Sequence, residues 1–199
     1  MVSETEPAVD EHGLDPTLAA SAIAGEVHPR AVVLVLRLPD AEESLTHQAA
    51  CAAQEIAAAH GIPYVKMLGT TIVAATGYGI GTGPGLADAA TRLADAAIAL
   101  RERCTALFED ADDQAAFSMG LDAGIILGAR LGSSPGLFNL WGEVMQGAGA
   151  LASSAPTETI QTSEQAYRLL RQNFLFRPRG LFHRPRTGAA RSYVLAGRA

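Results

Sequence analysis

Two patterns of apolar residues alternate along the chain and predict strands and helices in turn. Ala31–Leu38 is a continuous apolar run bounded by prolines, which predicts a buried central strand. Tyr64–Leu68 and Ile72–Thr76 are rich in β-branched and apolar residues, and the Gly-Thr pair between them predicts a hairpin. Leu86–Phe108 repeats leucine every seven residues, which is typical of a long amphipathic helix. Such a helix could pair with a parallel copy, but we expect it to pack on a sheet.

Turn-forming residues mark the ends of the other predicted elements. Asp40 and Glu43 fit a capping box, which predicts a helix with Asp40 as its N-cap that runs to about His60. The Gly-Ile-Pro sequence that follows is expected to end this helix. Leu140–Ala152 is expected to form a further helix. Gly77–Gly85 lacks the Gly-Lys-Ser/Thr ending of a P-loop and the acidic residue of a dinucleotide site, so we interpret it as a connection.

Length and composition fit one globular domain. The chain has 199 residues, of which 48% are hydrophobic, enough for a real core. We expect a mobile tail over residues 1–30 and a single domain over residues 31–199. No apolar run is long enough to span a bilayer, and the acidic start lacks a signal-peptide pattern, so a cytoplasmic location is expected. Cys51 and Cys104 are expected to be free, buried thiols, and the scattered histidines form no metal-ligand motif.

The net charge of −6 conceals an uneven distribution of charge. Five carboxylates lie within the first fifteen residues, whereas no acidic residue follows Glu164. Eight arginines occur from Arg168 to Arg198, and such a run forms either a solvated face or an anion-binding surface. The overall acidity argues against nucleic acid as a partner.

Lys66 is the only lysine of the chain and lies in the first strand of the predicted hairpin. The hairpin's K-x-x-G pattern, followed by a small polar residue, resembles the K-x-I-G-D hairpin of class III nucleotidyl cyclases. Five later segments resemble that family in the same order: Gly120–Gly132, Phe138–Leu151, Ile160–Leu170, Phe174–Gly180 and Arg191–Leu195. The resemblance implies an α+β fold with a ferredoxin-like βαββαβ core, added strands and helices, and helices packed on one sheet face. Strands that alternate with helices favour the same class.

The resemblance also implies which positions would carry the cyclase reaction, in which two metal ions assist cyclisation of a nucleoside triphosphate. The two metal-binding aspartates become Arg37 and Thr70 in this chain. The family's base-reading aspartate becomes Asn139, whereas the lysine that touches the purine is retained as Lys66. The transition-state asparagine and arginine become Gln146 and Ala150. A guanidinium cannot ligate Mg²⁺, which requires oxygen donors, so no catalytic or metal site is expected to be intact.

These departures favour a pseudo-cyclase that acts in signal transduction by binding a nucleotide, by dimerising, or by both. The partner is expected to be a second copy or another cyclase-type domain, with the hairpin and the segment around Trp141 in the interface. Asn139 and Gln146 retain hydrogen-bonding capacity toward a ligand. In a metal-free site the phosphates would be met by Arg37, Arg184 and Arg186, because guanidinium groups bind phosphate through paired hydrogen bonds.

Three alternatives remain open from the sequence. The chain could be a low-activity cyclase, in which case Mg²⁺ or Mn²⁺ would be its cofactor; otherwise no cofactor is expected. It could also be a protein-interaction module without a ligand. Arg37 could simply pair with Asp40 or Glu143, since buried arginines generally pair with a carboxylate.

Overall fold

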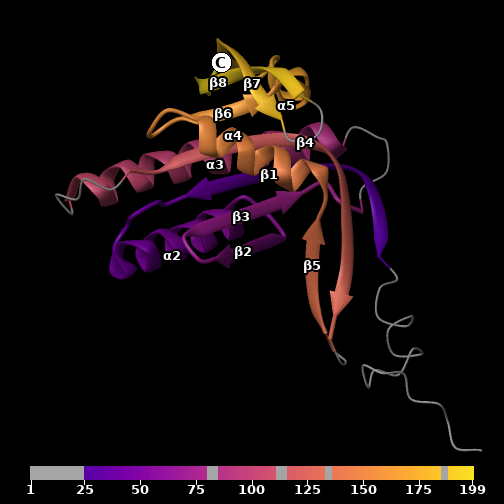
Figure 1. Cartoon of the computed structure of the whole chain (residues 1–199), viewed down its shortest axis with the longest axis horizontal. Coiled ribbons are helices and arrows are strands. Elements are labelled where there is room, and N and C mark those ends of the chain that lie inside the picture. Colours follow the sequence, from indigo (N-terminus) through magenta and orange to yellow (C-terminus); the bar gives the residue numbers. More distant parts are fainter. Residues whose placement is uncertain (1–24, 80–84, 111–115, 133–135, 185–187) are drawn as a thin grey trace, which may run out of the picture.

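The computed structural model describes residues 25–79, 85–110, 116–132, 136–184 and 188–199 (Figure 1). The predicted connection Gly77–Gly85 therefore lies partly outside the described residues, as do residues 1–24 of the predicted tail. The elements are, in order, β1 (Glu26–Arg37), α2 (Glu43–Ala59), β2 (Tyr64–Leu68), β3 (Thr71–Thr76), α3 (Gly85–Asp110), β4 (Ser118–Leu131), β5 (Leu137–Trp141), α4 (Glu143–Ser154), β6 (Ile160–Ser163), α5 (Glu164–Leu170), β7 (Phe174–Arg184) and β8 (Gly188–Arg198). No helix within these ranges is long and apolar enough to cross a membrane.

An eight-stranded mixed sheet organises the fold in the order β2-β3-β1-β4-β6-β8-β7, with β5 paired to β4. The first four strands, joined through α2 and α3, form the βαββαβ arrangement of a ferredoxin-like core. β1 is central and antiparallel to both β3 and β4, whereas β4 and β6 are parallel. The predicted α+β fold class and its ferredoxin-like core are therefore confirmed.

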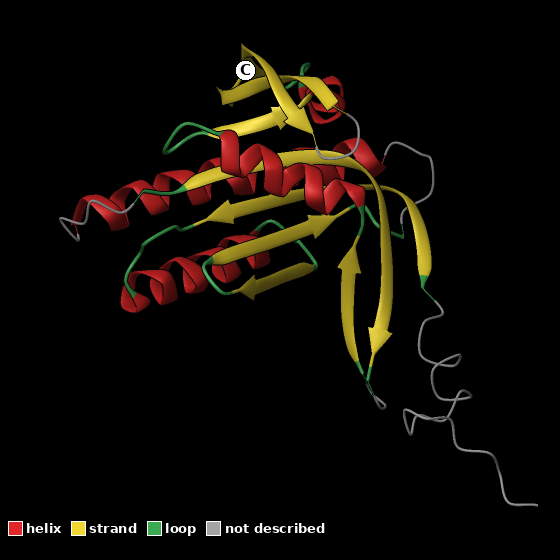
Figure 2. Ribbon diagram, viewed as in Figure 1, coloured by secondary structure: helices red, strands yellow, loops and turns green. Residues whose placement is uncertain are grey.

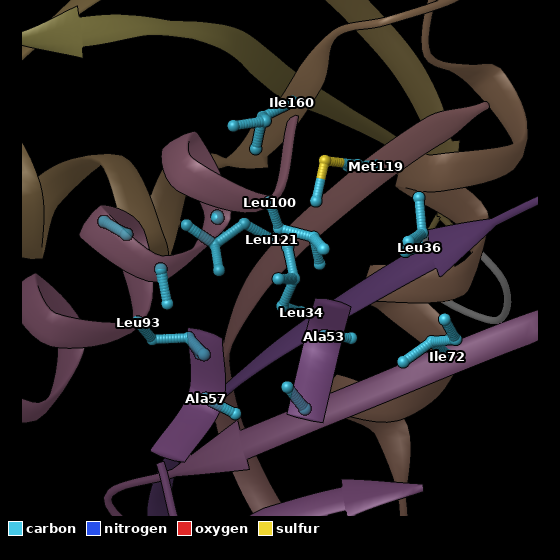
Figure 3. Packing of buried hydrophobic residues seen from close by; sticks show 14 of the residues in the cluster. Leu34, Leu36, Ala53, Ala57, Ile72, Leu93, Leu100, Met119, Leu121 and Ile160 are labelled. Carbon is cyan, nitrogen blue, oxygen red and sulfur yellow. The ribbon is translucent and has the colours of Figure 1, made fainter. Parts of the chain in front are cut away.

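Helices cover both faces of the sheet, which corrects the expectation that they pack on one face. Figure 2 shows helices on both sides of the sheet. Val32, Leu34 and Leu36 of β1 pack with α2, α3 and α5, whereas Val33 and Val35 pack with α4 on the other face. A strand that is buried on both faces carries apolar residues at successive positions, which explains the continuous apolar sequence of β1. Figure 3 shows the larger core, where leucines of β1 and β4 meet α3 and alanines of α2. The cavity left there measures only about 20 Å³, too little for a ligand.

The α4 helix approaches β4 so closely that the contact requires glycine. A Cβ added at Gly120 of β4 would lie 2.1 Å from the carbonyl oxygen of Ala148. Any larger residue would therefore push the helix off the sheet. This close contact fixes the position of α4 over β1 and β4. Arg37 lies at the end of β1, and Gln146 and Ala150 lie on α4, so the contact also positions these predicted site residues.

The structure corrects two element boundaries near the N-terminal end. β1 begins at Glu26 rather than at Ala31, because a register shift between His28 and Ala31 accommodates Pro29, which lacks an amide hydrogen. The capping box also does not form. Asp40 adopts a left-handed backbone with φ of 60°, and the helix is preceded by Glu42 without a side-chain cap.

Two other expectations need correction. Leu140 and Trp141 end β5 instead of beginning a helix, because Gly142 turns the chain with φ of 132° before α4 starts at Glu143. The two cysteines are free as predicted, and Cys104 is buried, but Cys51 is exposed on the outer side of α2. Burial raises the pKa of the Cys104 thiol to about 12.

Candidate functional site

Lys66 and Asn139, both expected to face a purine base, lie in direct contact. The ammonium group of Lys66 donates to the carbonyl oxygen of Phe138 at 2.5 Å and to Oδ1 of Asn139. Lys66 comes from β2, and the other two residues come from β5, so this contact links the hairpin to a strand far away in sequence. Both side chains are half-buried and reach solvent. The structure thus brings these two predicted site residues together.

An aromatic cluster lies beside this pair. Tyr64 and Tyr78 each contact the Phe138 ring, with centroids 6.3 and 5.8 Å away, and the Lys66 ammonium lies 5.5 Å from the Tyr64 ring. The pKa of both tyrosines is raised above the ordinary value, mainly by burial. His28 closes the cluster against Tyr78, and its buried Nε2 has no hydrogen-bond partner among the described residues. These rings fix the position of Phe138, whose carbonyl oxygen accepts from Lys66.

The two positions expected from the family to hold metal ions are neighbours in space. β1 ends at Arg37, and the amide of the next residue, Leu38, donates to the Thr70 carbonyl at 2.9 Å. Nη1 of Arg37 donates to Oγ of Ser153 on α4 at 2.7 Å, so its side chain lies on the α4 face of the sheet. Thr70 is exposed at the hairpin turn. The ion pair with Asp40 or Glu143, the alternative for Arg37, does not form within the described structure.

Arg184, which was expected to meet phosphate, forms an ion pair with a buried carboxylate. Its Nη2 lies 2.7 Å from Oδ2 of Asp122, whose side chain is fully buried while that of Arg184 is 14% exposed. Burial raises the pKa of Asp122, although hydrogen bonding from Ser163 and the charge of Arg184 lower it in part. Asp122 was not among the residues predicted to form the site, although the sequence shows it as a lone carboxylate within the apolar strand GLDAGII. Arg186 lies outside the described residues.

The remaining two predicted residues lie on α4. Gln146 is exposed near the start of the helix, and Ala150 is half-buried one turn later. In the part of the chain that the structure describes, the Gln146 side chain has no hydrogen bond to Lys66, Asn139 or Arg37. The described residues also contain no group of three or more His, Cys, Asp or Glu side chains that could hold a metal ion.

The fold, the lysine-bearing hairpin and the α4 face together define a class III cyclase domain. A family model of the adenylate and guanylate cyclase catalytic domain matches residues 45–197, and the chain belongs to this family. An adenylate cyclase of Mycobacterium tuberculosis (strain ATCC 25618 / H37Rv) is 24% identical over 144 residues, covering 72% of this chain and 32% of that protein. The chain thus spans only 32% of the length of the curated relatives that it matches.

Solved structures show the same fold. The adenylyl cyclase CyaB from P. aeruginosa matches with a TM-score of 0.76 at 16% identity, covering 87% of this chain and 96% of that one. The guanylate cyclase domain of RhGC from Catenaria anguillulae, solved in complex with GTP, matches with a TM-score of 0.71 at 17% identity. That match covers 87% of this chain and 100% of the other.

Proposed function

We propose that this chain is a cytoplasmic cyclase-homology domain of a signalling protein that does not itself turn over nucleotide. It acts by binding a purine nucleotide without metal and by pairing with a second cyclase-type domain. The observation that carries the proposal is Arg37, which stands at the end of β1 beside Thr70 and bonds to Ser153. At these two positions the family resemblance implies the aspartates that hold both metal ions.

The residues present do not fit a pair of divalent cations. Arg37 offers only donors, and Thr70 contributes one neutral hydroxyl oxygen. A guanidinium about 4 Å from a divalent ion would be repelled by several kcal/mol at an effective dielectric of about 20. The buried carboxylate among the described residues, that of Asp122, is already paired with Arg184. Ala150 stands where the family resemblance implies an arginine that stabilises the transition state, so this position also lacks the required positive charge.

The same substitutions suit a nucleotide bound without metal. The triphosphate charge then needs protein cations, and Arg37 supplies a fork whose present partner is a neutral, exposed serine. Lys66 and Asn139, the two residues proposed to contact the base, are hydrogen-bonded to each other. Gln146 is exposed on α4, where its side chain is free to form a further hydrogen bond with the nucleotide. Arg184 could contribute only by giving up its ion pair with Asp122, so it is a weaker phosphate ligand than Arg37.

Isothermal calorimetry with ATP and GTP in the presence of EDTA tests nucleotide binding. We expect binding that survives chelation, and a loss of at least about tenfold in affinity for Arg37→Ala, the equivalent of one lost charged contact of about 1.4 kcal/mol. Arg177→Ala, at an exposed arginine of β7, is the matched control and should bind as wild type. Absence of heat with every nucleotide would refute nucleotide binding and favour the interaction module.

A separate assay tests the absence of turnover. Purified protein incubated with Mn²⁺ and either ATP or GTP should form no cyclic nucleotide above background. Loss of one transition-state contact typically lowers the rate about 10²–10³-fold, and this chain departs at both the metal and the transition-state positions. Product that disappears on Glu143→Ala would overturn the pseudo-cyclase proposal and establish the low-activity cyclase.

A further inference from the structure

A pocket of about 340 Å³ lies on the face of the sheet opposite α4, where β1 and β4 run between the start of α3 and α5. This volume falls within the range of about 300–1,000 Å³ that is typical of small-molecule pockets. The pocket reaches β1 at Arg30, whereas the same strand ends at Arg37. Seven residues of extended chain span about 23 Å, so the pocket is separate from the candidate nucleotide site.

The floor of the pocket is apolar and carries almost no side-chain volume. Ala31 of β1 and Gly124 of β4 are cross-strand partners. Ala31 packs in the core cluster of α4, and a Cβ added at Gly124 would contact α4 at 3.7 Å, so both residues present only their backbone to the pocket. Ala123 adds a single methyl group, and Leu86 of α3 and Leu169 of α5 line the sides. A planar apolar group fits against such a surface.

The polar groups of the pocket are cationic or neutral. Arg30 comes from β1, and Gln165 and Arg168 come from α5, and all three residues are exposed. No carboxylate lies among the described residues that line the pocket. Arg30 forms no ion pair within the described structure. Two guanidinium groups thus converge on one apolar pocket without a carboxylate between them, which favours an anionic ligand.

Arg168 already has an ion pair, but a weak one. Its Nη2 lies 2.6 Å from Oε1 of Glu164, one turn earlier on α5. The two side chains are 70% and 34% exposed, and an exposed pair at this helical spacing contributes only about 0.3–0.5 kcal/mol. Arg168 can therefore exchange Glu164 for the anionic group of a ligand with little loss of stability.

We infer that this pocket binds a small anion with a planar apolar body, whose carboxylate or phosphate group is held by Arg30 and Arg168. Guanidinium groups bind the oxygens of either group through paired hydrogen bonds. The apolar body displaces water from the floor at Ala123, and the Gln165 amide can donate to or accept from a polar substituent. A neutral ring lacks the charged contact and an inorganic anion lacks the apolar one, so both parts of the ligand are required. The inference goes beyond nucleotide binding and does not depend on it.

Isothermal calorimetry of the full chain with 1-naphthoate and with 1-naphthyl phosphate tests the site and distinguishes a carboxylate from a phosphate ligand. At least one of them should bind with a dissociation constant below about 1 mM, and 1-naphthol and inorganic phosphate should each bind at least about tenfold more weakly. Arg30→Ala should weaken binding at least about tenfold by removing a charge, and Ala123→Leu should do so by filling the pocket. Glu164→Gln should strengthen binding, because it releases Arg168. Arg103→Ala, at an exposed arginine about 25 Å along α3 from the pocket, is the control and should bind as wild type.

Three results would overturn the inference. The first is the absence of binding by both naphthyl anions, or binding of 1-naphthol that is equally strong. The second is equal affinity of the wild type, Arg30→Ala and Ala123→Leu, because the probe would then bind elsewhere. The third is binding that is lost in Arg37→Ala and kept in Arg30→Ala, which would place the probe in the candidate nucleotide site. Circular dichroism and melting temperature, recorded for every variant, confirm that the domain remains folded during the comparison.

Discussion

At the scale of single residues, the most consequential contact is the one between Asp122 and Arg184. It places a carboxylate with no solvent exposure between the sheet and α4, where burial raises its pKa despite the nearby guanidinium. A buried ion pair adds little net stability, but removing one partner leaves an uncompensated charge. Arg184 therefore has a structural role that competes with the phosphate-binding role predicted for it.

Arg184→Ala should destabilise the domain by about 3–5 kcal/mol at a pH high enough to ionise Asp122, because its carboxylate is then left charged, buried and unpaired. An acid whose folded pKa is raised binds more protons in the folded state than in the unfolded state. The contribution of Asp122 to the free energy of unfolding is thus fully present below the pKa of an unfolded aspartate, about 3.9, and is lost as the pH rises through the pKa of Asp122 in the folded state. The cost of Arg184→Ala should therefore shrink when urea denaturation is repeated near pH 4.

Arg191→Ala, at an exposed arginine of β8, is the control and should change the unfolding free energy by less than about 0.5 kcal/mol at either pH. A cost for Arg184→Ala that is independent of pH would mean that the arginine acts through packing alone. Asp122→Asn in the same series tests whether titration of Asp122 causes the pH dependence, because it removes the titrating group and keeps the shape of the side chain.

At the scale of elements, α4 contains two glycines in different surroundings, and only one of them is required for the contact with β4. A Cβ at Gly147 would lie 2.1 Å from Oδ2 of Asp122, whereas a Cβ at Gly149 would meet nothing within 4 Å. Gly147→Ala should therefore cost about 1–3 kcal/mol through overpacking, and more where the ion pair breaks. Gly149→Ala should instead gain about 0.5–1 kcal/mol, because alanine has the higher helix propensity. Melting temperatures that moved in the same direction for both variants would contradict this account of the α4 contact.

The elements were largely predictable from sequence, and the exceptions have physical causes. The hairpin and the long helix α3 follow local periodicity, and both are confirmed. The position of α4 was not predictable, because an amphipathic stripe does not reveal which face of the sheet it covers. The capping box failed because Asp40 adopts a left-handed turn before the helix.

Part of the candidate site was also predictable from the sequence, and part of it was not. The contact between Lys66 and Asn139 could be anticipated, since both lie in motifs that resemble the family. The pairing of Arg184 with Asp122 could not, because the partners are 62 residues apart and no local pattern connects them. The sequence shows Asp122 as a lone carboxylate in an apolar run, but its burial follows only from the packing of α4 over β4.

At the scale of the whole molecule, the two edges of the sheet differ in a way that bears on assembly. β7 forms one edge and carries Arg177, Pro178 and Arg179, all exposed, which protect it against pairing with another chain. β2 forms the other edge and ends in Met67 and Leu68, which are 43% and 64% exposed. The unprotected edge belongs to the hairpin that the family resemblance places in the dimer interface.

We expect the chain to form a homodimer through this hairpin edge, because desolvation of Met67 and Leu68 favours association. Met67→Asp combined with Leu68→Asp should raise the dissociation constant of the dimer at least about tenfold, a change of 1.4 kcal/mol. Sedimentation velocity over a range of micromolar concentrations measures the shift. Leu181→Asp, at a leucine of β7 that is 70% exposed, adds charge at the opposite edge and should leave the dissociation constant unchanged. A wild-type chain that remains monomeric throughout, with or without nucleotide, would contradict the homodimer and leave another cyclase-type domain as the partner.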